Sequence, residues 1–120
     1  MKDDFKYKLE HNLEERKQEA NQILNGYKNR MPVICECAPN SNLPPLRKTK
    51  YLVPGDMTVT QFQFLIRRHL DLNEYSALYL ITQKGVTIAG NQTMMEVYNI
   101  HRDKHDNFLY LFYASELTWG

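Results

Sequence analysis

The chain has little of several features that mark common protein classes. Its 120 residues include only five glycines and two cysteines, and 15 Lys and Arg nearly balance 14 Asp and Glu. The glycines are scattered, so neither a G-x-G-x-x-G motif nor a Walker-type loop is present to bind phosphates. A net charge of +1 does not favour general binding to nucleic acid. No apolar run approaches the ~20 residues of a membrane-spanning helix. With 42% hydrophobic residues, we expect one soluble globular domain.

The first residues also lack the features of a targeting segment. The charged residues at positions 2–6 are not followed by an apolar stretch, and two of them are acidic, so neither a secretory signal nor a transit peptide is indicated. We therefore expect a cytoplasmic protein in which Cys35 and Cys37 remain reduced thiols.

The cysteines and two histidines raise the question of a zinc site. His101 and His105 have a spacing that can place two imidazoles on one helix face, but Cys35-x-Cys37 lacks the turn of a C-x2-C zinc knuckle. The same cysteines belong to a strand face that the pattern predicts to be buried, which disfavours a Cys-His nucleophile. We therefore expect no metal, no resident cofactor and no enzymatic activity.

Local motifs predict a single α+β domain. A capping box, in which a polar residue is followed three positions later by Glu or Gln, opens each of three predicted helices: Asn12 with Glu15, Thr58 with Gln61 and Thr93 with Glu96. The helices are predicted over residues 12–27, 58–69 and 93–101, and residues 5–11 are compatible with a short extra helix. Strands are predicted over residues 31–37, 48–53, 77–82 and 108–114. This order is typical of helices packed on a mixed sheet.

Alternation along strand 31–37 predicts which side chains share a face of the sheet. Met31, Val33, Cys35 and Cys37 face one side, and Pro32, Ile34 and Glu36 face the other.

Basic residues gather near the next strand. Arg47, Lys48 and Lys50 precede or begin it, and Arg67 and Arg68 follow in the second predicted helix. They are either a patch for acidic partners or charges that protect a sheet edge from self-association. In both cases an edge strand offers backbone groups to which an extended peptide can add.

The run from Lys50 to Arg68 resembles a known family. It reads KYLVPGDMTVTQFQFLIRR and is similar to the KYLVP-x-D-x-TV-x-QF-x-FLIR signature of the GABARAP-type autophagy ubiquitin-like modifiers. Further similar positions occur along nearly the whole chain: Phe5-Lys6, His11, Glu14, Arg16, residues 27–34, Thr93-Met94, Tyr98, His101, residues 108–110 and the final glycine.

The resemblance implies a ubiquitin-like β-grasp, in which two short N-terminal helices pack on a four-stranded mixed sheet. Residues 1–27 would form the helical extension, residues 28–114 the β-grasp, and residues 115–120 a flexible conjugation tail.

The resemblance also implies a function. An activating and then a conjugating enzyme would carry Gly120 as a thioester, and its carboxyl would form an amide with phosphatidylethanolamine. Glycine suits this step because it has no Cβ to obstruct a narrow channel. The two-chain lipid would anchor the protein to a membrane, either that of the autophagosome or, as in some lineages of this family, that of a plastid-like organelle. A deconjugating cysteine protease would be a further partner, and Trp119 is either an exposed tail aromatic or a contact for the processing or activating enzyme. We expect a monomer that does not bind nucleic acid.

The family's other partners are cargo receptors with an aromatic-x-x-aliphatic motif, which adds a strand beside the second strand of the sheet. The resemblance assigns the aromatic pocket to Glu19, Ile23, Pro32, Ile34, Lys50, Leu52 and Phe108. It assigns the aliphatic pocket to Tyr51, Val53, Pro54, Met57, Phe62 and Leu65. It assigns contacts with the motif's acidic flank to Arg30, Lys48, Lys50 and Arg67. From the residues alone, the alternative for most of these positions is ordinary core. For Phe62 and Leu65, which lie on the apolar stripe of the predicted helix, the two interpretations are equally good.

Some positions depart from the family pattern. His69 stands where a basic residue is usual, Asn12 replaces a proline, Asn107 takes a usually aromatic place, and paired prolines after the third strand are missing. These departures bear on partner preference and N-terminal packing and do not affect the conjugation tail. Two other functional classes stay open beside the conjugated modifier: an unconjugated peptide-binding or trafficking adaptor, and a small metalloprotein.

Overall fold

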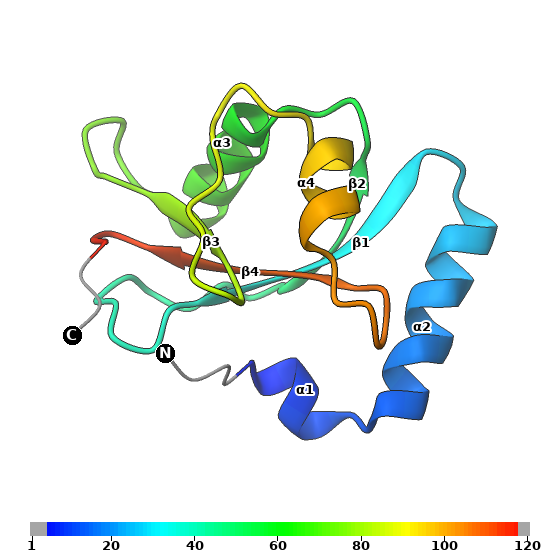
Figure 1. Ribbon diagram of the computed structural model, residues 1–120. Helices are drawn as coiled ribbons and strands as arrows, with labels where there is room; N and C mark the ends of the chain where they lie inside the picture. The colour runs from blue at the N-terminus through cyan, green and yellow to red at the C-terminus, as the bar shows by residue number, and fades with distance from the viewer. Residues whose placement is uncertain (1–4, 118–120) are drawn as a thin grey trace.

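The computed structural model describes residues 5–117 and contains four helices and one four-stranded sheet within that range (Figure 1). The helices are α1 (Lys6–Glu10), α2 (Leu13–Gly26), α3 (Val59–Leu70) and α4 (Met94–His101). The strands are β1 (Arg30–Cys37), β2 (Lys50–Pro54), β3 (Tyr79–Thr82) and β4 (Leu109–Ala114). The predicted α+β class, the element order and the extra N-terminal helix are confirmed.

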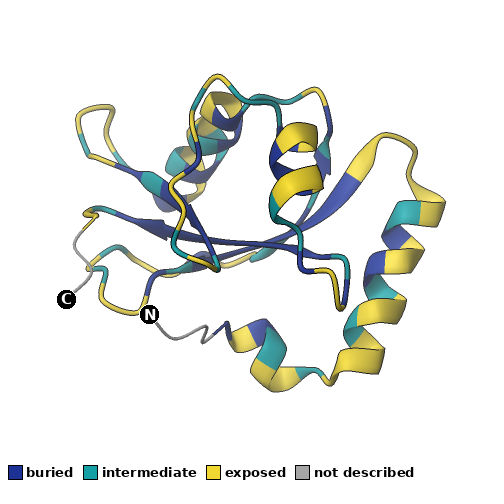
Figure 2. Ribbon diagram, viewed as in Figure 1, coloured by how far each residue is buried: buried dark blue, intermediate teal, exposed yellow. Residues whose placement is uncertain are grey.

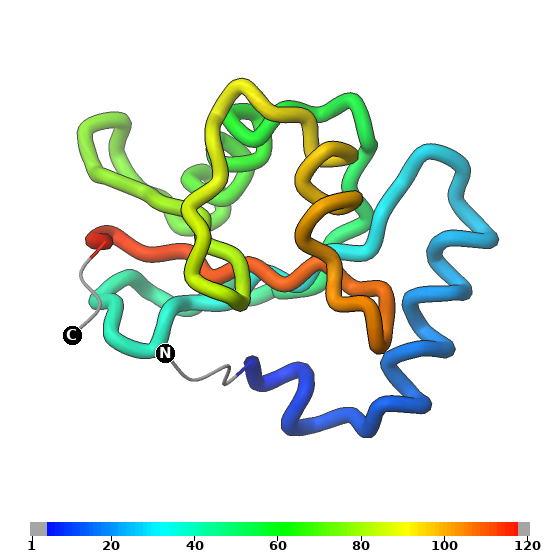
Figure 3. The backbone as a smooth tube through the Cα atoms, viewed as in Figure 1, coloured from blue at the N-terminus to red at the C-terminus, as the bar shows by residue number. Residues whose placement is uncertain are grey.

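The sheet has the strand order β2-β1-β4-β3. β1 pairs with β4 in parallel, with Val33 opposite Leu109, while β2 and β3 pair antiparallel to β1 and β4 respectively. Strands from opposite ends of the chain therefore lie side by side at the centre, as the tube in Figure 3 shows. β2 and β3 are left as the two edges.

Helices cover both faces of the sheet, with α1 and α2 on one side and α3 and α4 on the other (Figure 1). The alternation predicted for β1 is confirmed, because Val33 and Cys35 lie in the core under α3 and α4, whereas Ile34 lies in the core under α1 and α2. β4 is buried along its whole length (Figure 2). Cys37 is only half-buried, and its Sγ donates to the Leu43 carbonyl at 3.5 Å.

The three predicted capping boxes all form. In each, the polar side chain accepts from the backbone N–H three residues later, and the Glu or Gln side chain accepts from the N-cap backbone N–H. Three strand starts were predicted too early: β2 begins at Lys50 rather than residue 48, β3 at Tyr79 rather than residue 77, and β4 at Leu109 rather than residue 108. β-propensity alone does not show where pairing with a neighbour begins.

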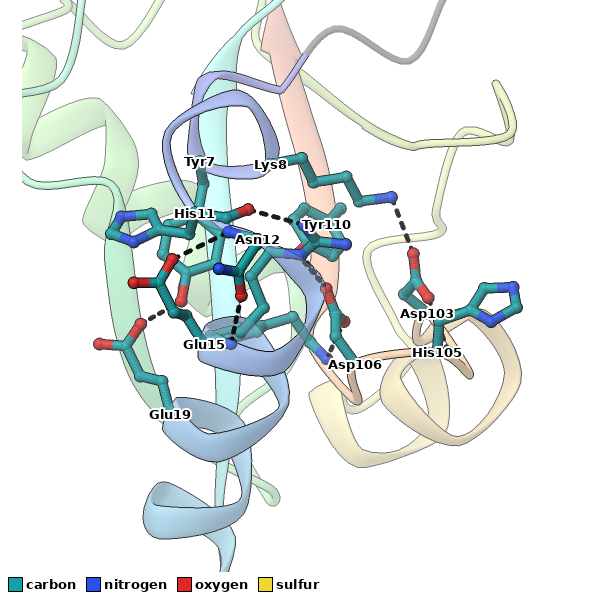
Figure 4. A network of polar contacts seen from close by, with 12 residues as sticks. Tyr7, Lys8, His11, Asn12, Glu15, Glu19, Asp103, His105, Asp106 and Tyr110 are labelled. Carbon is teal, nitrogen blue, oxygen red and sulfur yellow. Dashed lines mark hydrogen bonds and ion pairs between the residues drawn. The ribbon is translucent and has the colours of Figure 1, made fainter.

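The N-terminal helices are held to the sheet by packing and by charge. Phe5 is fully buried and stacks on Phe112, with ring centroids 3.9 Å apart. Arg16 on α2 donates through Nε to Asp106 at 2.9 Å, and Tyr110 donates to the same fully buried carboxylate (Figure 4). Within residues 5–117, no helix is both long and apolar enough to cross a membrane.

Candidate functional site

The outer edge of β2 is the candidate site, because this strand pairs with β1 on one side only. The N–H of Cys35 donates to the Thr49 carbonyl at 2.8 Å, and the N–H of Gly55 donates to the Asn29 carbonyl at 2.9 Å. Hydrogen-bonded and non-hydrogen-bonded pairs alternate in an antiparallel ladder. The backbone N–H and C=O groups of the odd-numbered residues in segment 49–55 therefore point toward β1. The backbone groups of Lys50 and Leu52 therefore face outward.

One of these outward groups is already engaged by a side chain of the same chain. Arg30, at the start of β1, donates through Nη1 to the Leu52 carbonyl at 3.1 Å. The Arg30 side chain is exposed. An arriving strand that uses this carbonyl must displace the guanidinium.

Most residues expected in the aromatic pocket gather on the side of the sheet covered by α2. Ile34 and Phe108 are fully buried, Ile23 is 7% exposed, and Leu52 packs against the same cluster. Pro32 is buried as well. These side chains are therefore part of the core on this side of the sheet, and an aromatic ring can reach them only if neighbouring side chains move.

Glu19 and Lys50 join α2 to β2 near this cluster. Lys50 Nζ forms an ion pair with Glu19, and the Tyr7 hydroxyl donates to the other carboxylate oxygen; Figure 4 shows the Tyr7 contact. Burial alone would raise the pKa of Glu19, but the hydrogen bonds from Lys50 and Tyr7 and the charge of Lys50 outweigh it and lower the pKa. The carboxylate is thus held charged at neutral pH, and the pair bridges α2 and β2.

Most residues expected in the aliphatic pocket lie on the opposite face of β2, beside α3. Tyr51, Val53 and Phe62 are buried in the main core, and the Tyr51 and Phe62 rings meet edge to face with centroids 5.6 Å apart. Met57 and Leu65 are half-buried and pack against that core. Pro54 is also half-buried. Phe62 therefore has a core position, while Met57, Leu65 and Pro54 offer surface.

His69 contacts this second cluster through Tyr51. The Tyr51 hydroxyl donates to the Lys48 carbonyl at 2.8 Å and lies 3.2 Å from His69 Nδ1. The Lys48 ammonium lies 5.4 Å from the centre of the Tyr51 ring. Lys48 precedes β2 and is exposed, so its charge is available next to the edge.

Arg67 has a different environment from Lys48 and Lys50. Its Nη1 donates to the carbonyl of Ser76 and, at 3.4 Å, to that of Asn73. The guanidinium therefore braces the loop after α3, a role that its basic charge alone did not indicate.

Surface cavities lie at both ends of β2. One, of about 360 Å³, lies between α1 and the segment before β2 and is lined by Tyr7, Pro45, Leu46 and Thr49 among others. The other, of about 610 Å³, is shallow and is lined by Arg30, Pro54 and Met95 among others. An extended chain along β2 would run from one cavity to the other.

Two sequence predictions concern other places. Gly120 and Trp119 lie outside the described residues. Among residues 5–117, no three His, Cys, Asp or Glu side chains are placed to share a metal ion. Cys35 is fully buried, and burial raises its pKa, so its thiol stays protonated.

Sequence reasoning missed the contacts that tie the site to the rest of the molecule. Tyr7 was not expected beside Glu19, and Arg30 was not expected on the Leu52 carbonyl. Both contacts join residues distant in sequence, and no local spacing signals them.

Comparisons with known proteins agree with this architecture. The family model described as "Autophagy protein Atg8 ubiquitin like" matches residues 15–120. An autophagy-related protein 8-like protein of Dictyostelium discoideum is 40% identical over 117 residues, covering 95% of this chain and 92% of the relative. Autophagy-related protein 8 of Saccharomyces cerevisiae (strain YJM789) is 41% identical over 115 residues, covering 95% of this chain and 96% of the relative.

A solved structure gives the same result. The crystal structure of Trypanosoma brucei ATG8 superposes with a TM-score of 0.88 at 35% identity, covering 98% of this chain and 99% of the other. The fold is therefore ubiquitin-like, and the resemblance predicted from the Lys50–Arg68 run is confirmed. The chain belongs to the Atg8 family of ubiquitin-like autophagy proteins.

Proposed function

We propose that the chain is a ubiquitin-like modifier that is conjugated through Gly120 to phosphatidylethanolamine and then acts as a membrane-tethered adaptor. In this role it takes part in autophagosome formation and recruits cargo receptors. It is not itself an enzyme: activating and conjugating enzymes form the amide, and a cysteine protease cleaves it. The protein would move from the cytoplasm to the autophagosome membrane when lipidated.

The observation that carries this proposal is an Atg8-family chain in which the edge strand β2 lies beside two apolar clusters. The edge supports the adaptor role, because an extended peptide can add to outward backbone groups at Lys50 and Leu52. The family supports the modifier role, and the resemblance assigns the conjugated glycine to position 120.

Peptide binding would proceed by exchange of contacts already present in the free chain. The added strand takes the Leu52 carbonyl from Arg30. Its aromatic side chain separates Lys50 from Glu19 and reaches the cluster formed by Ile34 and Phe108. Its aliphatic side chain lies on the other side, against Met57 and Leu65.

Acidic residues ahead of the motif would meet Lys48 and the released Lys50. Both are at the surface, where an ion pair contributes only about 0–1 kcal/mol. These charges would therefore act more on the rate of encounter and on orientation than on final affinity.

The test is conjugation with defined components. The chain is incubated with the matching activating and conjugating enzymes, ATP and phosphatidylethanolamine liposomes, and its intact mass is measured. We expect a gain of one lipid less one water, and no gain for Gly120→Ala.

A second arm separates the two adaptor hypotheses. If the wild-type chain gains no lipid while the same enzymes conjugate another family member, the modifier role is wrong. Binding of an aromatic-x-x-aliphatic peptide, measured by calorimetry on the unconjugated chain, would then support the soluble adaptor.

A further inference from the structure

A basic cavity lies away from the β2 edge. It has a volume of about 300 Å³ and lies between the turn after β3 and the segment that ends α4. Five of the residues that line it are lysine, arginine or histidine: Lys84, His101, Arg102, Lys104 and His105. None of them belongs to the peptide site described above.

The one acidic side chain in the cavity is already neutralised. Asp103 accepts from Lys8 Nζ at 2.8 Å, from the His105 backbone N–H at 2.8 Å and from Gln83 Nε2 at 3.3 Å. Figure 4 shows Lys8 reaching from α1 to this carboxylate, while the His105 ring points away from it. The charge of Asp103 is therefore matched by Lys8, and the charges of Lys84, Arg102 and Lys104 remain in excess.

Arg102 is held in place by the end of α4. Its Nη1 donates to the Asn99 carbonyl at 3.1 Å, and its guanidinium lies 5.8 Å from the centre of the Tyr98 ring. Its other N–H groups can bind a planar or tetrahedral anion in a defined direction. Burial lowers the pKa of His101, and the charge of Lys84 lowers it further. The Lys84 ammonium is therefore close enough to His101 to act on it electrostatically.

Aliphatic side chains stand beside these cations at the surface. Ile100, which lines the cavity, is 64% exposed, and Val86, at the end of the turn that carries Lys84, is 45% exposed. Cations next to exposed aliphatic groups are typical of surfaces that contact lipid headgroups and the adjoining acyl chains. A site for free phosphate has no need of the aliphatic groups.

We propose that this cavity binds the phosphate headgroup of an anionic membrane lipid. Lys84, Arg102 and Lys104 contact the phosphate oxygens, and Ile100 enters the boundary between headgroups and acyl chains. This contact does not require conjugation, so it can be tested on the unconjugated chain, and failure of the proposed conjugation would leave it unaffected.

The test is flotation of the unconjugated chain with vesicles. We expect binding to phosphatidylcholine vesicles that carry phosphatidic acid and little binding to phosphatidylcholine alone. The triple variant Lys84→Gln, Arg102→Gln, Lys104→Gln should bind at least about tenfold more weakly, because it removes three cations that face the anionic surface.

A matched variant controls for net charge. Lys17→Gln, Lys28→Gln, Arg68→Gln removes the same number of charges from exposed positions elsewhere and should keep most of the vesicle binding. Equal losses in the two triple variants would overturn the proposal in favour of non-specific attraction. Thermal unfolding of each variant confirms that it is folded.

Ile100→Asn and two soluble probes identify the ligand. We expect Ile100→Asn to abolish vesicle binding. Addition of glycerol 3-phosphate to this variant should still change the NMR chemical shifts of His101 and His105, as it does in the wild type. Shifts with glycerol 3-phosphate but no wild-type vesicle binding would reassign the cavity to a soluble phosphate ester. Tighter binding of a poly-glutamate peptide than of the vesicles would reassign it to an acidic protein.

Discussion

The Asp106 carboxylate has no exposed surface, yet it accepts hydrogen bonds from a distant helix as well as from the residues that follow it. Arg16 on α2, the Tyr110 hydroxyl and the Phe108 backbone N–H all donate to it. Burial would lower the pKa of Arg16, but its hydrogen bond to Asp106 and the neighbouring negative charges raise the pKa instead. Asp106 therefore fixes α2 against the sheet, and with it the position of Glu19.

Arg16→Met should destabilise the fold strongly, because it leaves the Asp106 charge buried without a cation. We expect the free energy of unfolding to fall by about 3–5 kcal/mol in urea denaturation. The exposed neighbour Lys17→Met should change it by less than about 0.5 kcal/mol. Adding Asp106→Asn to Arg16→Met should recover part of the lost free energy of unfolding. If Arg16→Met destabilises the chain no more than Lys17→Met does, the Arg16–Asp106 pair does not stabilise the fold.

At the scale of one element, β2 is both a sheet edge and a strand whose outward groups are partly occupied. Arg30 holds the Leu52 carbonyl, and the ion pair of Glu19 with Lys50 lies beside the same stretch. A free edge invites unwanted pairing with other chains, and charged side chains on it reduce that tendency. The same contacts must be given up when a peptide binds.

Arg30→Ala should therefore strengthen binding of an aromatic-x-x-aliphatic peptide with uncharged flanks. Release of one exposed hydrogen bond corresponds to a gain of about two- to tenfold in affinity, which calorimetry can measure. A peptide with acidic flanks should gain less, because it also loses the Arg30 charge. Lys17→Ala, at an exposed position of α2, serves as the control. Weaker binding of the uncharged peptide to the Arg30→Ala variant would show that Arg30 contacts the ligand directly.

Local signals in the sequence predicted the elements better than their contacts. The box of Thr58 with Gln61 fixed the start of α3 because both partners lie within one helical turn. Alternation placed Val33 and Ile34 on opposite faces. The hydrogen bonds of Arg67 to the carbonyls of the following loop were not expected, because they depend on how that loop folds back. Its contact with a partner's acidic flank stays a prediction.

At the scale of the whole molecule, two charged contacts make stability depend on pH. Lys8 pairs with Asp103, and Lys50 with Glu19, each joining an N-terminal helix or edge strand to a distant part of the chain. For Asp103, burial would raise the pKa, but the hydrogen bonds from Lys8, the His105 backbone and Gln83 lower it. Both carboxyl pKa values are thus lower in the folded chain than their ordinary values.

A carboxyl with a lowered pKa stabilises the fold fully above its ordinary pKa, and this contribution is lost as pH falls through the lowered value. The ordinary values are 4.5 for Glu19 and 3.8 for Asp103, so Tm should fall as pH drops below that range. Asp103→Asn should lower Tm at pH 7 and reduce the decrease of Tm between pH 7 and acidic pH, the acid limb of the Tm curve. Both effects can be measured by calorimetry. An unchanged acid limb would mean that other carboxyls determine it.

The parallel pairing of β1 with β4 also bears on how the protein is made. During synthesis the N-terminal half, including β1 and the β2 edge, leaves the ribosome long before residues 109–114 exist. Until then the edge of β1 that pairs with β4 has no partner. Ile34 also lacks the Phe108 and Tyr110 side chains, which belong to the same core cluster. Contacts between distant segments also slow folding. The sheet can be completed only after β4, at residues 109–114, has been translated. A nascent chain that stalls before that point would expose both edges of the β1–β2 pair to chaperones and to aggregation.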